Sequence, residues 1–242
     1  MIRLCVIGNP IFHSKSPEIH GELLRKAGIE GSYTAVRVLP EELPEFVHSA
    51  KAGAWDGFNV TMPHKEAILP LLDELSPTAK AISGVNTVVI HHGRAVGHNT
   101  DAPGLLEAIN GPVAGKTALI LGFGGAGKAA AYALSQAGAT VKVCCRHPKA
   151  GQYNWEKLEL LAAECDILVN ATPLGMICGE KWPDFDFLDG MTHNSLVFDM
   201  VYGPAPTALT AEAQRRGLAA IDGQKLLQRQ AEIAFQLFVS DR

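Results

Sequence analysis

Short apolar runs of strand length alternate with helical segments along this chain, and the alternation occurs twice. This pattern is typical of parallel sheets built from strand–helix–strand units, so it predicts an α/β fold with two sheets. In the first set the expected strands are residues 4–7, 33–38, 57–60 and 85–90. In the second set they are residues 118–121, 141–144, 166–169 and 196–199.

Helices are expected between these strands. In the first set they begin near Pro17, Glu41, Pro63 and Pro77, and proline is favourable at a first helical position because its missing N–H has no intrahelical partner there. Between the two sets lies the stretch NTDAPG at residues 99–104, followed by an apolar helix. We place a domain boundary at this stretch.

Composition excludes several classes of protein. The chain has 242 residues, a hydrophobic content of 47% and a formal net charge of -4. It can therefore form a packed core, and nucleic acid is not an expected partner. Its most apolar stretch, residues 117–143, is broken by glycines and Lys128, so no membrane span is expected. The five cysteines, without CxxC spacing, and the lack of a charged leader predict a cytoplasmic protein with core thiols. No ligand spacing for a metal occurs.

A glycine-rich motif, LILGFGGAGKAAAYAL, marks the start of the second set. Gly122, Gly124 and Gly127 form G-x-G-x-x-G between an expected strand and an expected helix. These glycines permit a tight turn, close approach to a pyrophosphate and close helix–strand packing. A tight connection without a ligand needs glycines too, but the strand–helix context favours a Rossmann-like dinucleotide-binding domain.

The end of the next strand bears on the choice of dinucleotide. An NAD site usually has a carboxylate there for the ribose 2′-hydroxyl, whereas this chain has Arg146, His147 and Lys149 and no acid. The sequence therefore predicts NADP. The alternative is that Arg146 is an exposed cation at a strand end.

Polar side chains follow the expected strands of the first set, at the positions where open α/β sheets bind ligands. Amides and hydroxyls dominate, and this suits a small polyhydroxylated substrate, with Lys65 and Asp101 as a pair that moves a proton. Singly, these residues have simpler explanations as helix caps, turn residues or solvated cations. The residues are Ser14, Ser16, Asn59, Thr61, Lys65, Asn86, Thr87, Asn99, Thr100 and Asp101.

The order and spacing of eight motifs resemble those of shikimate dehydrogenases. The resemblance runs from Gly8 to Ala231, nearly the whole chain. The motifs are GNPIFHSKSPEIH, NVTMPHK, VNT, GHNTD, GFGGAGKA, NATPLGM, DMVYGPAPT and GQKLLQRQA.

The resemblance implies a role for each matching residue. Ser14, Ser16 and nearby Tyr202 are expected at the carboxylate of shikimate, and Lys65 and Asp101 as the catalytic pair. The residues expected around the ring hydroxyls are Asn59, Thr61, Asn86, Asp101 and Gln230. Those expected at the cofactor are Gly122, Gly124, Gly125, Ala126, Gly127, Arg146, His147, Lys149, Thr172 and Gly223.

The resemblance also implies an organisation. Residues 1–100 would form a substrate domain with a mostly parallel sheet, and residues 101–222 a Rossmann-like NADP-binding domain, with a cleft between them. Residues 223–242 would form a C-terminal helix that returns to the substrate domain. A monomer and a homodimer both stay open.

The chain departs from the family pattern in three places. Cys145-Arg146-His147 stands where Asn-Arg-Thr is common, residues 150–164 look short for the usual helix and strand, and Leu226 replaces a usual methionine. The first two bear on the strength of the NADP preference.

The expected activity is reversible reduction of 3-dehydroshikimate to shikimate. Two alternatives are a quinate/shikimate dehydrogenase of mixed specificity and a non-catalytic NADP-binding regulatory protein.

Overall fold

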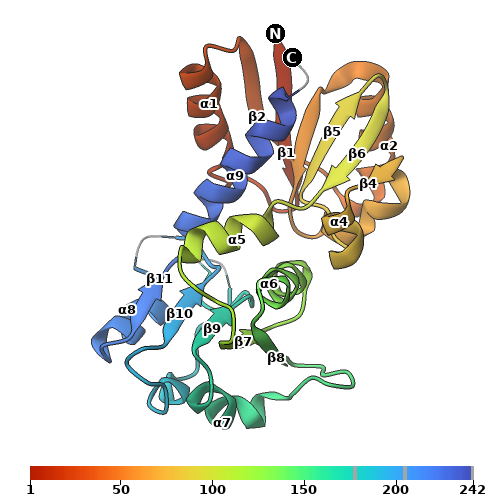
Figure 1. Cartoon of the computed structure of the whole chain (residues 1–242). Helices are drawn as coiled ribbons and strands as arrows, with labels where there is room; N and C mark the ends of the chain where they lie inside the picture. The colour runs from red at the N-terminus through yellow and green to blue at the C-terminus, as the bar shows by residue number, and fades with distance from the viewer. Residues whose placement is uncertain (177–178, 204–205, 241–242) are drawn as a thin grey trace. The chain divides into compact units, whose positions relative to one another are not determined.

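The computed structural model of the chain describes residues 1–176, 179–203 and 206–240 (Figure 1). The chain divides into two compact units. Unit 1 comprises Met1–Thr100 and Gln230–Arg242, and unit 2 comprises Asp101–Arg229. The C-terminal helix α9 (Gly223–Val239) therefore contributes its first turns to unit 2 and its remainder to unit 1. Pro204 and Ala205 of the DMVYGPAPT motif and Cys178 lie outside the described residues.

Unit 1 is built on a sheet whose order, within the described residues, is β2-β1-β3-β5-β6-β4. β1 pairs in parallel with both β2 and β3, and β4 pairs in parallel with β6. β5 is antiparallel to β3 and to β6, so the sheet is mostly but not wholly parallel. The strands are β1 (Ile2–Gly8), β2 (Gly31–Arg37), β3 (Gly57–Val60), β4 (Glu74–Leu75), β5 (Thr87–His91) and β6 (Arg94–His98).

The reversed direction of β5 corrects the expectation that residues 85–90 continue a parallel set. A two-residue turn, His92-Gly93, follows β5, and both residues have positive φ (48° and 74°). This is the conformation of a type I′ hairpin turn, which makes the next segment pair antiparallel, here with His91 opposite Arg94. The returning strand β6 is short and lacks a continuous apolar run, so the sequence pattern did not predict it.

Helices of unit 1 begin close to the prolines that mark them. Pro17 lies in the first turn of α1, and Pro77 opens α4, whose first turn is capped by the Ser76 hydroxyl accepting from the backbone N–H of Ala79 (3.2 Å). The expected helix near Glu41 is a 3-10 turn that leads into α2. The helical elements are α1 (Ser16–Ala27), η1 (Pro40–Glu42), α2 (Leu43–Ser49), η2 (Ala50–Ala54), α3 (His64–Ala67), η3 (Leu69–Leu71) and α4 (Pro77–Ile82).

The two faces of this sheet are buried by different elements. On one face Cys5, Phe58 and Val88 pack with α2 residues such as Leu43 and Val47. On the other face a second cluster includes Ile2, Leu4, Leu24, Phe235 and Phe238. The C-terminal part of α9 thus covers β1 and belongs to the core of unit 1, as Figure 1 shows.

Unit 2 has a parallel sheet in the order β11-β10-β9-β7-β8. The four expected strands lie within one residue of the observed ones, and β11 was not expected. Its strands are β7 (Thr117–Leu121), β8 (Thr140–Cys144), β9 (Ile167–Asn170), β10 (Leu196–Asp199) and β11 (Ala219–Ile221). Its helical elements are α5 (Asp101–Ile109), α6 (Gly125–Gln136), η4 (Trp155–Lys157), α7 (Leu158–Ala163), η5 (Asp186–Leu188) and α8 (Ala208–Arg215).

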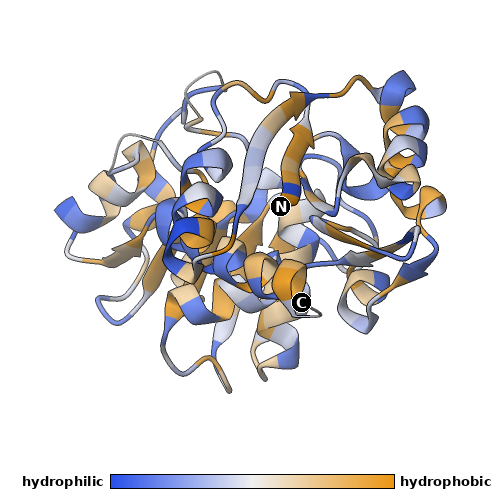
Figure 2. Cartoon of the chain, turned by 90° about the horizontal axis from the view of Figure 1, so that it is seen from above, coloured by the Kyte–Doolittle hydropathy of each residue, from blue (hydrophilic) through white to orange (hydrophobic). Residues whose placement is uncertain are grey.

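Burial in unit 2 follows the chemistry of the strands. Leu119, Ile120 and Leu121 of β7 are fully buried, whereas α8 buries only Leu209, Thr210 and Ala213. Figure 2 shows hydrophobic and hydrophilic residues on the same helices. The short segment after β8 makes a single parallel bridge between Cys144 and Tyr153 and then forms η4 and α7. A short helix is therefore present there, but the usual strand is reduced to that bridge.

Candidate functional site

The loop after β1 carries the two serines singled out in the sequence. Ser14 is half-buried, and its hydroxyl accepts a hydrogen bond from the backbone N–H of Ser16 (3.3 Å). Ser16 is buried and is the first residue of α1. The N-cap is Lys15, without a side-chain cap bond, so capping does not explain Ser16.

Lys65 stands on the single-turn helix α3, directly after the loop that follows β3. Thr61 holds this loop to β1, because its backbone N–H donates to the carbonyl of Ile7 (2.9 Å). Lys65 is half-buried, and its carbonyl accepts from the N–H of Val85 (2.8 Å), just before β5. The loop with Thr61 and Lys65 and the start of β5 are therefore positioned together.

A buried polar network joins several of the expected substrate residues of unit 1. The Asn59 side-chain amide donates to the Asn86 carbonyl (3.1 Å) and to the Thr87 hydroxyl (2.9 Å). The Asn86 amide donates to the Thr100 hydroxyl (2.9 Å), which in turn interacts with Oε1 of Gln230 on α9 (3.4 Å). Residues that are distant in the sequence thus meet where β3 ends and β5 begins. Both amide hydrogens of Asn59 are used within the network.

The network continues to a residue that sequence reasoning missed. The Tyr33 hydroxyl on β2 donates to Oδ1 of Asn59 (2.6 Å), and the Tyr33 ring stacks on the His20 ring with a centroid separation of 4.2 Å. Both ring nitrogens of His20 are buried and lack a hydrogen-bond partner among the described residues. Burial lowers the pKa of His20 to about 3. His20 is therefore a neutral core residue.

This buried histidine predicts acid lability. The unfolded chain protonates His20 at its ordinary pKa of about 6.5 but the folded chain only near 3, so stability falls as pH drops below 6.5 and continues to fall toward 3. At pH 5 the expected loss is about 2 kcal/mol. Urea unfolding of His20→Phe at pH 7 and pH 5 should show most of this difference removed. The same series with exposed His48→Phe is the control, and equal pH dependence in wild type and His20→Phe would contradict the assignment.

Two further expected substrate residues lie in unit 2. Asp101 is buried and begins α5. Tyr202 follows β10 and is half-buried, and burial raises its pKa. The side-chain amide of Asn99 donates to the carbonyl of Gly84 (3.0 Å) within unit 1.

The glycine loop of unit 2 is sterically specific. Gly122 has φ +88°, a conformation that favours glycine, and a Cβ on Gly127 would lie 2.2 Å from the carbonyl oxygen of Gly122. At Gly124 a Cβ would meet nothing within 4 Å. Gly125 and Ala126 form the first turn of α6. The loop is therefore packed on its inner side and open at Gly124, the shape that lets an anion approach a helix N-terminus.

Two buried residues hold the loops beside it. The Asn170 amide at the end of β9 donates to Oδ1 of Asp199 at the end of β10 (2.9 Å), and Oδ1 of Asn170 accepts from the Thr172 hydroxyl (2.7 Å). Burial raises the pKa of Asp199, and hydrogen bonds from Thr207, Asn170 and the Val201 backbone oppose that rise. Asn170 and Asp199 belong to motifs noted in the sequence, but their role there was not predicted.

Close packing against the backbone explains why position 223 is a glycine. A Cβ at this position would lie 2.4 Å from the carbonyl oxygen of Met200 and 2.6 Å from that of Val201. Its own N–H donates to the Val201 carbonyl (3.0 Å). Only glycine lets α9 start this close to the loop after β10.

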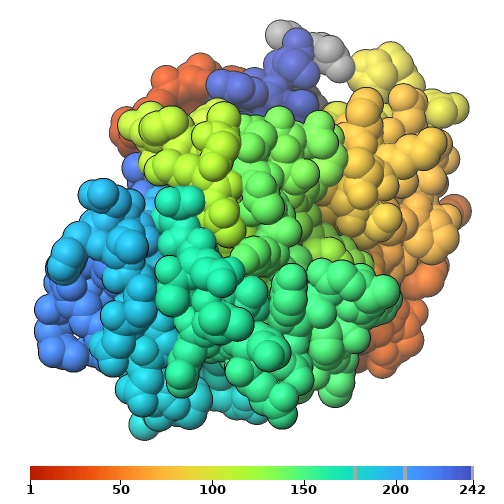
Figure 3. All heavy atoms as spheres, turned by 60° about the horizontal axis from the view of Figure 1, so that its bottom comes forward, coloured from red at the N-terminus to blue at the C-terminus, as the bar shows by residue number. Residues whose placement is uncertain are grey.

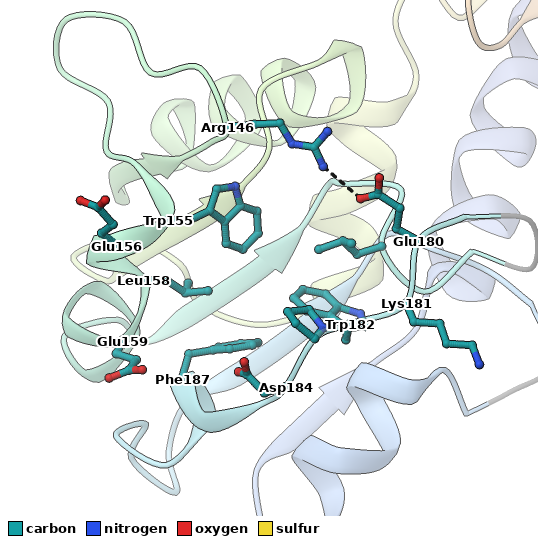
Figure 4. A pocket seen from close by; sticks show the side chains of 12 residues that line it. Arg146, Trp155, Glu156, Leu158, Glu159, Glu180, Lys181, Trp182, Asp184 and Phe187 are labelled. Atoms are coloured by element: carbon teal, nitrogen blue, oxygen red, sulfur yellow. Dashed lines mark hydrogen bonds and ion pairs between the residues drawn. The ribbon is translucent and has the colours of Figure 1, made fainter.

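A pocket of about 680 Å³ lies beside the end of β8. One wall comes from the segment with Trp155 and Leu158 and the other from the segment with Trp182 and Phe187, and these segments lie side by side on the surface of unit 2 (Figure 3). Its walls combine apolar side chains, such as Trp155, Leu158, Trp182 and Phe187, with charged ones that include the acids Glu156, Glu159, Glu180 and Asp184. Figure 4 shows Arg146 at one end of it, with Nη2 3.0 Å from Oε2 of Glu180. Both partners are about 70% exposed. His147 and Lys149 are exposed on the same loop.

Glu180 changes the local electrostatics predicted from sequence. The sequence contains no acid next to Arg146, but the fold brings one from 34 residues further along.

The buried Cys5, Cys144 and Cys165 are core thiols as expected, and burial raises the pKa of each. In the part of the chain that the structure describes, no group of three or more His, Cys, Asp or Glu side chains could hold a metal ion. No helix among the same residues is long and apolar enough to cross a membrane.

Comparison with known proteins identifies related chains for both units. Residues 6–88 match the family model described as shikimate dehydrogenase substrate binding domain. Residues 90–176 match the model described as D-isomer specific 2-hydroxyacid dehydrogenase, NAD binding domain. The first match includes Ser14, Ser16 and Lys65, and the second includes the glycine loop and Arg146, whereas Tyr202, Gly223 and Gln230 lie beyond both matches.

Similar full-length proteins are also found. The shikimate dehydrogenase (NADP(+)) of Archaeoglobus fulgidus is 41% identical over 98% of this chain and 93% of the relative. That of Methylobacterium radiotolerans is 40% identical over 99% of this chain and 92% of the relative. The crystal structure of shikimate 5-dehydrogenase from Thermus thermophilus, in complex with NADP(H) and shikimate, has a TM-score of 0.89 at 38% identity, with 99% of this chain and 94% of that chain covered.

Proposed function

The chain belongs to the shikimate dehydrogenase family, and from this premise we propose that it catalyses the reversible, NADPH-dependent reduction of 3-dehydroshikimate to shikimate in the cytoplasm. The observation that carries the proposal is similarity to shikimate dehydrogenases over nearly the full length, with the substrate and catalytic residues of the family motifs present and departures confined to Cys145-Arg146-His147, residues 150–164 and Leu226. The resulting oxidoreductase requires two binding functions, and unit 1 and unit 2 each supply one.

Unit 1 provides most of the substrate contacts. Ser14 and Ser16 bind the carboxylate, which suits two hydroxyls held one residue apart in a fixed loop. Thr61, Asn86 and Gln230 contact the ring hydroxyls, and Asn59 supports them from the buried network. Tyr202 in unit 2 contributes to the carboxylate end. Preorganised hydroxyls and amides favour a polyhydroxylated ring over an apolar one.

Lys65 donates the proton that the reaction needs. When bound, NADPH supplies the hydride to the C3 carbonyl of 3-dehydroshikimate. Negative charge then develops on the carbonyl oxygen, and a positioned ammonium stabilises that charge and transfers a proton to it. Lys65 is half-buried on a helix tied to β5, so its starting position is fixed by backbone hydrogen bonds. The family resemblance assigns Asp101 as the second member of the catalytic pair; it is buried and begins α5.

The residues of unit 2 fit NADP. The open side at Gly124 leaves room for a pyrophosphate at the N-terminus of α6. The family resemblance assigns Thr172, which follows β9, and Gly223, the first residue of α9, to the nicotinamide. Arg146, with His147 and Lys149, offers cations to a 2′-phosphate. The aromatic pocket beside Arg146 suits an adenine ring. These residues together favour NADP over NAD.

Replacing Arg146 with alanine should weaken NADPH binding selectively. Wild type is expected to prefer NADPH over NADH by at least tenfold, a difference of about 1.4 kcal/mol. Only NADPH carries the phosphate, so Arg146→Ala should remove most of this preference and leave the NADH dissociation constant nearly unchanged. Titration of each cofactor by its fluorescence at two salt concentrations measures both effects, since screening should shrink the preference as salt rises.

Glu180→Gln is the matched partner variant. The carboxylate competes with a phosphate for the guanidinium, so its neutral isostere should bind NADPH modestly tighter and NADH about equally. Equal losses for NADPH and NADH in Arg146→Ala would instead show that Arg146 supports the loop and does not select the cofactor.

A two-by-two assay tests the function itself. Purified protein is offered shikimate or quinate with NADP or NAD, and NADPH or NADH formation is followed by near-ultraviolet absorbance. The proposal predicts that shikimate with NADP is the fastest combination. Comparable rates with quinate would indicate the mixed-specificity enzyme, and no turnover in any combination, with NADP bound, would indicate the regulatory protein.

A further inference from the structure

We propose that Tyr33 is a positioning residue for substrate recognition, whose hydroxyl fixes the orientation of Asn59. This assignment rests on the proposed function, in which Ser16 binds the carboxylate of shikimate and the Asn59 network supports the residues at its ring hydroxyls. Tyr33 is not part of any motif that carries the family resemblance. It is identified by its place in the sheet.

The sheet order brings Tyr33 to this position. Tyr33 lies on β2 opposite Leu4 of β1, and Asn59 lies on β3 opposite Val6 of β1. Two strand spacings, about 10 Å, therefore separate β2 from β3 across β1, and Tyr33 and Asn59 are also offset by two residues along it. A tyrosine side chain spans β1 and ends in a hydroxyl, which donates to Oδ1 of Asn59 over 2.6 Å. A shorter polar side chain on β2 would not reach it.

This hydrogen bond decides which way the Asn59 amide faces. An asparagine side chain has one acceptor oxygen and one NH₂ donor, and the two exchange places when the amide rotates by half a turn. With Tyr33 donating to Oδ1, the NH₂ group faces the Asn86 carbonyl and the Thr87 hydroxyl and donates to both. Thr87 in turn donates to Oδ1 of Asn86 (3.0 Å). The orientation set by Tyr33 is thus passed on to Asn86, which is expected to contact substrate.

Tyr33 is itself held firmly as a donor. It is 8% exposed, and its ring stacks on His20 with an interplanar angle of 2°. Burial raises the pKa of Tyr33 well above its ordinary value, Cys5 adds to this, and an interaction with the Ser16 side chain opposes it. The hydroxyl therefore keeps its proton at working pH and remains a donor to Asn59.

Tyr33→Phe tests the assignment because it deletes one oxygen and retains the ring that stacks on His20. The KM for shikimate should rise about five- to thirtyfold, the factor expected when a buried group loses its hydrogen-bond partner. The kcat should change less than the KM, and the dissociation constant of NADPH, measured by fluorescence, should stay unchanged. Tyr153→Phe in unit 2 is the matched control. It should leave the KM for shikimate, the kcat and the dissociation constant of NADPH unchanged.

Two further variants test how Tyr33 acts. If Tyr33 acts through Asn59, the double variant Asn59→Ala/Tyr33→Phe should raise the KM less than the product of the single effects. Thr87→Val removes the hydroxyl at the opposite end of the Asn59 amide and should give the same KM-selective loss. A folded Tyr33→Phe or Thr87→Val with unchanged KM, even if its melting temperature falls, would overturn the positioning role.

The outcome for Tyr33 can be separated from the outcome for the proposed function. Wild-type protein that neither binds nor turns over shikimate would overturn the proposed function and this assignment with it. Wild type and Tyr33→Phe that bind shikimate equally, in isothermal titration calorimetry, would overturn the assignment alone.

Discussion

Replacing Lys65 with alanine is expected to lower the turnover number for shikimate oxidation by about two to four powers of ten, the usual scale for a positioned acid–base group. Oxidation removes the proton from the C3 hydroxyl, and reduction returns it, so the same side chain serves both directions. The alanine variant keeps the backbone bond from Val85 to the residue 65 carbonyl. Substrate binding should therefore change far less than turnover.

The measurement compares kcat and KM with the dissociation constant of shikimate, so that a loss of chemistry is separated from a loss of binding. Lys80→Ala is the matched control, because Lys80 is an exposed lysine of the same unit on α4. It should leave kcat unchanged. Turnover of Lys65→Ala within tenfold of wild type would remove Lys65 from the role of proton donor.

The second large effect is expected at Gly127. An added Cβ would lie 2.2 Å from the carbonyl oxygen of Gly122 and 2.9 Å from its carbonyl carbon. Both are backbone atoms, so the clash can be relieved only if the loop moves. Gly127→Ala should therefore lower the affinity for NADPH by about a hundredfold or more, equivalent to about 2.7 kcal/mol. Overpacking should also destabilise the protein by about 1–3 kcal/mol.

Gly124→Ala separates packing from ligand approach. A Cβ at Gly124 meets nothing within 4 Å, and the backbone there has φ -78°, so the variant should fold with wild-type stability. If a pyrophosphate lies against this open side, NADPH affinity falls in Gly124→Ala as well, without a change in melting temperature. Gly127→Ala that retains both stability and affinity would show that the loop tolerates the shift, contrary to this account.

Much of the fold follows from local sequence patterns. The strands and glycine loop of unit 2 were predicted because buried parallel strands are continuous apolar runs and the turn needs glycine at positions such as Gly122. The hairpin of β5 and β6 was missed because its signal was a single dipeptide, His92-Gly93. The two-residue strand β4 carries no periodic pattern at all, and only pairing with β6 defines it.

For the candidate site too, some features follow from the sequence and others only from the tertiary structure. Sequence alone predicted candidate residues for the chemistry, such as Ser16, Lys65 and Arg146, because each lies in a motif whose spacing is local. Tertiary structure alone decided their partners. Tyr33 lies 26 residues from Asn59, and Glu180 lies 34 residues from Arg146. A hydrogen bond or ion pair between distant residues depends on strand order and on the path of the chain, and neither is encoded in the spacing of a motif.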